Sequence, residues 1–245
     1  MLQIKNLNKS YGAIKAADNC NFTIKPNKIT GLIGPNGAGK STVFNIISGF
    51  EKEDSGTIIF NGKDISKFTP EGIANSGISR VFQKSRLFNN LTVYENLEIA
   101  IEEENTKFLK SFFSSNKLNT KQEKRIKEVL ELLKIYEVKD LQCKELSYGQ
   151  KRLVELCRAI LKPHKLMILD EPVAGVHPSI RNTIMEVLKL LKGSGETILL
   201  IEHDMFFTLN ICDEIIVMDD GKVIAKGSPE QIKNNKKVLE AYLGE

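Results

Sequence analysis

Eight consecutive residues form the clearest chemical pattern in the chain. They match the phosphate-binding pattern G-x-x-x-x-G-K-S and are Gly34, Pro35, Asn36, Gly37, Ala38, Gly39, Lys40 and Ser41. Glycines let backbone amides wrap around a polyphosphate, because a chain without Cβ atoms can approach it closely. Lys40 adds positive charge toward the β- and γ-phosphates, Ser41 offers a hydroxyl to Mg²⁺, and Thr42 completes the expected nucleotide-binding set. A glycine-rich turn that binds nothing is the alternative, which the predicted strand before the pattern and the helix after it disfavour.

A second pattern places two carboxylates at the end of an apolar run. Residues 166–169 read Leu-Met-Ile-Leu, and Asp170 and Glu171 follow directly. In phosphate-loop enzymes an aspartate at such a strand end holds Mg²⁺. Glu171 is then free to polarise a water molecule for attack on the γ-phosphate. An acid that merely ends a strand is the alternative interpretation.

A third pattern opens a long amphipathic helix. Residues 146–150 read Leu-Ser-Tyr-Gly-Gln, and Ser147 with Gln150 fits the capping box, in which each side chain satisfies a backbone amide of the other residue. Taken alone, these residues favour a plain helix start over a ligand site.

In this order the three patterns resemble the ATP-binding subunit of ABC transporters, and the resemblance covers nearly the whole chain. Three further residues match the family: Tyr11 its adenine-stacking aromatic, Gln83 its Q-loop glutamine and His203 its switch histidine. The resemblance implies ATP and Mg²⁺ as cofactors. It also implies catalytic roles for Glu171, His203 and Gln83 and metal-binding roles for Ser41, Gln83 and Asp170.

The resemblance further implies a composite active site. In the family, the helix start that corresponds to Ser147, Gly149 and Gln150 faces the γ-phosphate bound by the other protomer. Two ATP molecules close two facing subunits, and hydrolysis lets them part. The implied partners are a second ATP-binding subunit, integral membrane permease subunits and a solute-binding protein, with no nucleic acid. The implied location is peripheral, at the cytoplasmic face of the inner or plasma membrane.

The resemblance implies that the helical insertion and the segment after Gln83 contact a cytoplasmic helix of the permease. The candidate contact residues are Phe88, Leu91 and Leu97, and ordinary core packing is the equally open alternative for each.

Two residues depart from the family pattern. Tyr148 stands where the family usually has glycine, which narrows the space beside the phosphate. His177 stands where the D-loop usually ends in aspartate or asparagine. Because histidine changes charge near neutral pH, this position is a candidate for pH sensitivity, although a histidine without such a role is the favoured interpretation.

Several local stretches resemble the subunit of branched-chain amino acid importers, namely residues 80–83, 86–88, 92–97, 148–150, 171–175 and 238–245. Related subunits for urea uptake or lipopolysaccharide export share much of this pattern. A soluble cassette ATPase acting on DNA or ribosomes is disfavoured, because it would need a coiled coil, a second cassette or a basic face, and the sequence shows none of these. A metabolic phosphate-loop kinase is also disfavoured, because it would need a substrate lid and would not need the helix that begins at Ser147. The cargo, the direction of transport and the identity of the second cassette stay open.

The elements that must position these residues are short strands and capped helices. Strands are predicted at 3–7, 22–24, 29–33, 57–60, 166–169, 197–201 and 215–218, with a hairpin through 222–225. The later runs are apolar at nearly every position, which is typical of a parallel sheet covered on both faces. Capping boxes predict helix starts at Thr92, Thr120, Ser147 and Ser228.

The predicted fold class is α/β. The family resemblance implies a RecA-like phosphate-loop core, residues 1–83 and 146–245, with an antiparallel β subdomain. Residues 84–145 are expected to form a helical subdomain inserted between the Q-loop and the signature motif, with the role of residues 104–119 left open.

Composition sets the remaining limits. The chain has 245 residues, 41% hydrophobic, and a net charge of +4, which is too small an excess to indicate a nucleic-acid partner. Its apolar runs are far shorter than the roughly 18 residues that span a bilayer, and the start resembles no secretion signal, so a cytoplasmic protein is expected. Four cysteines without C-x-x-C spacing and only three histidines disfavour a zinc site and predict reduced, buried thiols.

Overall fold

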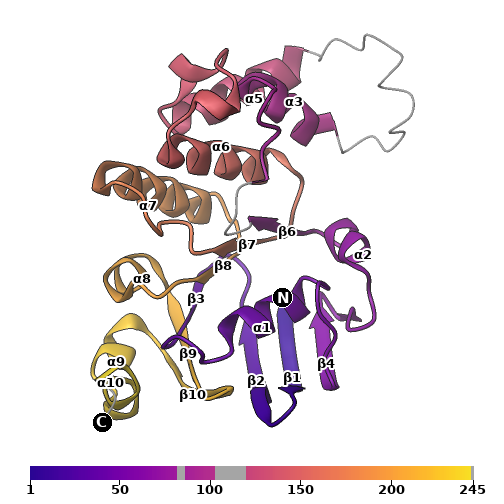
Figure 1. The fold of residues 1–245 in the computed structure, drawn as a ribbon, viewed down its shortest axis with the longest axis vertical. Helices are drawn as coiled ribbons and strands as arrows, with labels where there is room; N and C mark the ends of the chain where they lie inside the picture. The colour runs from indigo at the N-terminus through magenta and orange to yellow at the C-terminus, as the bar shows by residue number, and fades with distance from the viewer. Residues whose placement is uncertain (82–85, 103–119, 244–245) are drawn as a thin grey trace. The chain divides into compact units, whose positions relative to one another are not determined.

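The computed structural model describes residues 1–81, 86–102 and 120–243 (Figure 1). The chain forms two compact units: unit 1 contains residues 1–80, 165–171 and 189–245, and unit 2 contains residues 81–164 and 172–188. These units group segments by packing, and the subdomain boundaries expected at residues 83 and 146 stay a prediction.

Unit 1 contains a four-stranded antiparallel sheet in the order β2-β1-β4-β5. Its strands are β1 (Leu2–Tyr11), β2 (Ile14–Ile24), β4 (Ser55–Phe60) and β5 (Lys63–Asp64). This sheet confirms the expected antiparallel β subdomain. The first two strands are much longer than predicted, because bulges at the polar residues of their middle interrupt the alternation without ending the pairing.

A second, six-stranded sheet has the order β10-β9-β3-β8-β7-β6. β3 (Ile29–Ile33) lies parallel to β8 (Ile198–Ile201) and β9 (Glu214–Asp219), and β7 (Leu166–Asp170) lies parallel to β8. β10 (Lys222–Gly227) pairs antiparallel with β9. In such a sheet, ligands bind beyond the carboxyl ends of the parallel strands, where the phosphate loop, Glu171 and His203 follow β3, β7 and β8.

The strand β6 (Ile78–Val81) was not predicted. It has four residues, two of them polar, and a run that short carries no readable period.

Five helices of unit 1 are described: α1 (Lys40–Ile47), α2 (Pro70–Asn75), α8 (Met205–Ile211), α9 (Pro229–Lys233) and α10 (Lys236–Leu243). The buried core joins α1 to both sheets, since Phe44 of α1 belongs to one cluster with Phe60 and Ile168. The helix that follows the phosphate loop is therefore fixed by burial of its apolar side chains.

Unit 2 is helical. α3 (Val93–Glu102) and α5 (Thr120–Leu132) pack on α6 (Tyr148–Leu161), with the 3₁₀ turns η1 (Tyr136–Val138) and η2 (Cys143–Glu145) between α5 and α6. α6 is amphipathic as predicted, and its buried apolar stripe contains Leu153, Leu156, Cys157 and Ile160. α7 (Pro178–Gly193) begins in this unit.

Three of the four predicted capping boxes are confirmed, at Thr92, Ser147 and Ser228. Thr120 is instead the first described residue of α5, and its box stays a prediction.

All four cysteines are free and buried, as expected. Within residues 1–81, 86–102 and 120–243, none of the helices combines the length and the apolar character that crossing a bilayer needs.

Candidate nucleotide-binding and hydrolysis site

The phosphate loop connects β3 to α1, and other backbone lies close to its two ends. Gly39 is the residue before α1 and has φ +92°. A Cβ at Gly39 would lie 1.9 Å from the carbonyl oxygen of Ala16, and one at Gly34 would lie 2.0 Å from that of Met218. Side chains are excluded at both ends of the loop, so Gly34 and Gly39 are steric requirements here.

Lys40 is held inside this loop. Its Nζ donates hydrogen bonds to the carbonyl oxygens of Gly34 (2.7 Å) and Pro35 (2.8 Å), and the residue is only 7% exposed. Burial lowers the pKa of Lys40, and the carboxylate of Glu171 opposes that shift. Phosphate oxygens are stronger partners for an ammonium group than these carbonyls, so a bound nucleotide can take their place.

Tyr11 lies at the edge of the same region. Its hydroxyl donates to Glu51, and it also contacts the hydroxyl of Thr42, two residues beyond Lys40. Burial is the main cause that raises the pKa of Tyr11. The residue is nevertheless 46% exposed, which leaves ring surface available for stacking.

Glu171 has an unusual backbone conformation. Its φ is +48°, a left-handed value that costs a non-glycine residue about 1–3 kcal/mol. Its amide donates to the carbonyl oxygen of Ile201 at 2.8 Å, which links the turn after β7 to β8. Nδ1 of His203 lies 3.7 Å from Oε1 of Glu171, so the structure brings these two predicted residues together.

The sequence interpretation missed Glu202. This side chain is fully buried, and its Oε2 accepts the amide hydrogen of His203 at 3.2 Å and lies 3.9 Å from the Nδ1 of that residue. Glu202 therefore shapes the turn that carries His203. The available signal was an acid at the end of an otherwise apolar strand.

Asp170 faces a residue that was quoted only for branch resemblance. Its Oδ2 lies 3.7 Å from a guanidinium nitrogen of Arg80, whose plane stacks over the ring of Phe44 at 3.9 Å. Arg80 also donates to Oδ1 of Asn45 at 3.0 Å. The guanidinium therefore ties the end of β7 to α1.

The donors predicted for Mg²⁺ are a hydroxyl and a carboxylate, from Ser41 and Asp170. Hard oxygen ligands of this kind suit Mg²⁺, so the residues present fit the ion. The third predicted ligand, Gln83, lies outside the described residues.

Unit 2 carries the signature turn. Oγ of Ser147 accepts the amide hydrogen of Gln150 (3.3 Å), and Oε1 of Gln150 accepts that of Ser147 (2.9 Å). The amides of Tyr148 and Gly149 are the other first-turn donors, which an α-helix cannot satisfy internally. Tyr148 is 53% exposed, and a Cβ at Gly149 would meet the Ile180 side chain, whose terminal Cδ1 lies nearest at 2.1 Å.

A buried ion pair on α6, also missed from the sequence, fixes this helix. Arg152 and Glu155 pair at 3.0 Å and are nearly inaccessible. Arg152 Nε donates to the carbonyl oxygen of Pro172 at 3.4 Å, and Glu155 accepts the amide hydrogen of Arg86 at 3.0 Å. The pair therefore ties α6 to the segment after Glu171 and to residue 86.

His177 caps α7. Its Nδ1 accepts the amide hydrogen of Ser179 at 3.3 Å and lies 2.9 Å from Oγ of the same serine. Its carbonyl oxygen accepts from the amides of Ile180 and Arg181. A structural role accounts for this histidine, in line with the favoured interpretation.

The three candidate permease contacts separate by burial. Leu97 is fully buried and is a core residue, Leu91 is partly buried and Phe88 is 48% exposed.

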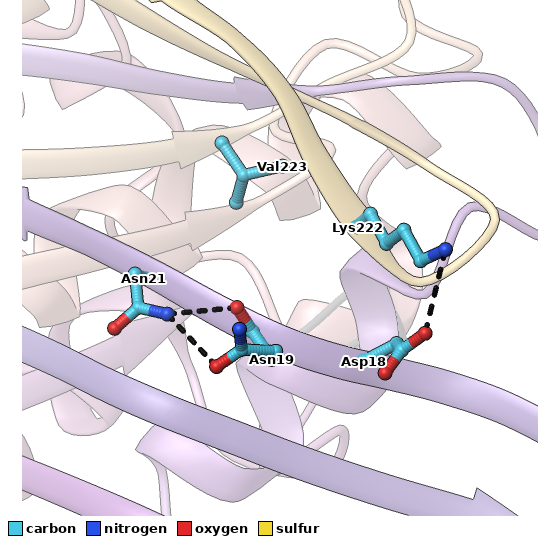
Figure 2. Close-up of a pocket in the computed structure, with 5 residues that line it drawn as sticks. All are labelled: Asp18, Asn19, Asn21, Lys222 and Val223. Carbon is cyan, nitrogen blue, oxygen red and sulfur yellow. Dashed lines mark hydrogen bonds and ion pairs between the residues drawn. The ribbon is translucent and has the colours of Figure 1, made fainter.

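A hollow of about 410 Å³ opens elsewhere on unit 1, lined by Asp18, Asn19, Asn21, Lys222 and Val223 (Figure 2). None of the predicted site residues lines it. Lys222 reaches Asp18 at 3.5 Å across it, and Asn21 bonds to Asn19.

Most of the predicted site residues belong to unit 1: Tyr11, the phosphate loop with Lys40 to Thr42, Asp170, Glu171 and His203. Ser147, Gly149 and Gln150 belong to unit 2.

Comparisons with known proteins agree with this arrangement. Residues 17–174 match the family model of ABC transporters, and residues 222–245 match the model of branched-chain amino acid ATP-binding cassette transporters. The probable branched-chain amino acid transport ATP-binding protein LivG of Archaeoglobus fulgidus is 41% identical, with 100% of this chain and 95% of the relative covered. The lipopolysaccharide export system ATP-binding protein LptB of Haemophilus influenzae is 36% identical, with 100% and 98% covered.

Solved structures show the same fold. The ADP conformation of an ATP-binding cassette of an ABC transporter superposes with a TM-score of 0.85 at 36% identity, covering 100% of this chain and 99% of that one. A dimeric cassette in a post-hydrolysis state, bound to ADP and phosphate, has a TM-score of 0.78 at 26% identity, covering 94% and 99%. The chain therefore belongs to the ATPases of ABC transporters, in the LivG-like family of branched-chain amino acid transport ATP-binding proteins.

Proposed function

We propose that this chain hydrolyses ATP to drive the import of branched-chain amino acids through membrane permease subunits. The main support for this cargo is the match of residues 222–245 to the branched-chain model, because the general cassette model covers only residues 17–174. The LivG relative supports the same cargo, and the LptB relative keeps lipopolysaccharide export as the second candidate.

The proposed roles of the nucleotide-site residues follow from their chemistry. Amides of residues 34–39 and the ammonium of Lys40 bind the phosphates, and Tyr11 stacks on the base. Glu171 polarises the attacking water, and His203, whose Nδ1 lies 3.7 Å from Glu171 Oε1, donates to the γ-phosphate. Ser41, Asp170 and Gln83 would hold Mg²⁺, which supplies charge neutralisation on the phosphates when bound.

A second copy or homologous subunit completes the site in this proposal. The Ser147–Gln150 box satisfies its own donors, while the amides of Tyr148 and Gly149 are first-turn donors that the helix itself cannot satisfy. Phosphate oxygens are suitable acceptors for amides at such an end. We therefore assign Ser147, Gly149 and Gln150 to the γ-phosphate that the facing subunit binds.

Mixing two inactive variants tests the composite site. Lys40→Ala disables the phosphate loop, and Ser147→Arg disables the signature turn. A mixed dimer of the two contains one intact site, so the mixture should regain about one quarter of wild-type ATP hydrolysis in a twofold-symmetric assembly. Each variant mixed with itself is the control. Absence of recovery would contradict a site shared between two copies.

The cargo is tested with the transporter reconstituted in vesicles. The chain is combined with its permease subunits and solute-binding protein, and ATP-dependent uptake of leucine, valine and urea is measured. Leucine and valine should accumulate and urea should not. Uptake of urea alone, or no uptake with lipopolysaccharide-stimulated ATP hydrolysis, would overturn the proposed cargo.

A further inference from the structure

The C-terminal helix reaches back to the first glycine of the phosphate loop. Tyr242 lies near the end of α10, its hydroxyl oxygen is buried, and the backbone amide of Gly34 faces that oxygen. The contact lacks the geometry of a regular hydrogen bond, and no other described group bonds to the hydroxyl. The C-terminal end of unit 1 therefore places a polar atom directly against the nucleotide loop.

Gly34 is confined on its other sides as well. Its carbonyl oxygen accepts the hydrogen bond from Lys40 Nζ at 2.7 Å, and its Cα lies against the carbonyl oxygen of Met218 so closely that a Cβ would come within 2.0 Å. A displacement of this one residue would thus also displace an acceptor that holds Lys40. Through Gly34, the position of Tyr242 bears on the position of the phosphate-binding ammonium.

The far end of the loop is attached to the same C-terminal region. The amide of Gly221, in the turn between β9 and β10, donates to the carbonyl oxygen of Ala38 at 3.2 Å. The carbonyl oxygen of Gly221 accepts from the amide of Asp18 at 2.8 Å, and the Asp18–Lys222 pair spans the same corner (Figure 2). Both ends of the loop therefore rest on residues 218–242.

α10 is itself well anchored within unit 1. Val238 of α10 and Ile232 of α9 are each about 1% exposed, and α10 packs on β10 and α9 (Figure 1). Burial raises the pKa of Tyr242 to about 12, so the hydroxyl stays neutral throughout the physiological range. Its oxygen is consequently a permanent dipolar neighbour of the Gly34 amide.

We propose that Tyr242 is a positioning residue for ATP binding: α10 holds its hydroxyl against Gly34, and this contact sets the phosphate loop in the shape that receives the phosphates. The proposal rests on the assigned ATP-binding role of residues 34–42. It gives the segment matched by the branched-chain model, residues 222–245, a task at the nucleotide site.

Tyr242→Phe is the deciding variant, since it removes the hydroxyl and keeps the ring. Hydrogen exchange of the full-length, nucleotide-free protein is measured for peptides covering residues 30–42, together with KM and kcat for ATP. The matched control is Tyr94→Phe, which removes the hydroxyl of a partly buried tyrosine on α3. We expect loop amides to exchange about tenfold faster and KM to rise about three- to tenfold, with kcat within about twofold.

Two results would overturn the proposal. One is a Tyr242→Phe protein with wild-type exchange in residues 30–42 and wild-type KM. The other is equal acceleration in peptides of β7 and β8, which would mean general loss of stability. The exchange measurement needs no nucleotide, so failure of the wild-type protein to bind ATP would instead count against the proposed function.

Discussion

The phosphate loop and the signature turn each offer backbone amides at the start of a helix, but their surroundings differ. The loop is enclosed at its two ends, where Lys40 is buried and a Cβ on Gly39 would collide with the backbone of Ala16, while Asn36 and Gly37 in its middle are exposed. The signature turn has no backbone around its glycine: Ser147 and Tyr148 are exposed, and Gly149, although buried, is limited by the Ile180 side chain.

The two regions therefore differ in how completely the chain's own residues build a binding site. The loop is shaped by its own chain around a place for phosphates, with Glu171 and His203 nearby. The turn is complete as a helix start, because its box satisfies its own donors, yet it presents amides with no ligand of its own. In the proposed dimer, the phosphate bound by the facing subunit would be the acceptor for these amides.

The largest effect is expected from removal of the proposed base, Glu171, in the region of the phosphate loop. Glu171→Gln should lower ATP hydrolysis by about 10²- to 10⁴-fold, because the amide cannot act as a base toward water. ATP affinity, measured by titration calorimetry, should stay within about twofold. Glu128→Gln on exposed α5 is the control and should hydrolyse ATP normally. Unimpaired turnover of Glu171→Gln would remove this residue from the mechanism.

The next test compares one methyl group in each region. Gly39→Ala places its Cβ against backbone at a positive φ and should weaken ATP binding about 100-fold or more. Gly149→Ala meets only a side-chain end and lies in a helix, so ATP binding by a single copy should stay within about twofold. Equal loss of affinity in both variants would erase the contrast between the two regions.

A smaller effect is expected at the base-binding edge. Tyr11→Ala should weaken ATP binding about tenfold or less, because aromatic stacking contributes only about 0.5–1.5 kcal/mol beyond buried area. Tyr11→Phe keeps the ring, loses the hydroxyl contact with Glu51 and should bind like the wild type. Complete loss of binding in Tyr11→Ala would show that the base, and not the phosphates, dominates affinity.

The smallest effect concerns His177. Asparagine is a good helix cap, so His177→Asn should change the free energy of unfolding by less than about 0.5 kcal/mol. ATP hydrolysis should follow the wild-type pH profile between pH 6 and 8. A pH profile that differs between the two proteins would show that His177 is a pH-sensitive contact and not only a helix cap.

Much of the site was readable from the sequence because its constraints are local. The glycine spacing before Lys40, the acid pair after an apolar strand and the Ser147–Gln150 box each depend on neighbouring residues. The same holds for the parallel strands, since burial on both faces leaves continuous apolar runs. These features can be recognised from the sequence without knowledge of the fold.

Other features depend on residues far apart in the chain, and only the tertiary structure decided them. The left-handed backbone of Glu171, the stacking of Arg80 on Phe44 beside Asp170, and the contact of Tyr242 with Gly34 all arise from elements brought together by packing. A sequence lists types and spacing, whereas strain, burial and distant pairing are properties of the packed chain. The sequence by itself therefore determined which chemistry this protein has, and the fold decided what holds that chemistry in place.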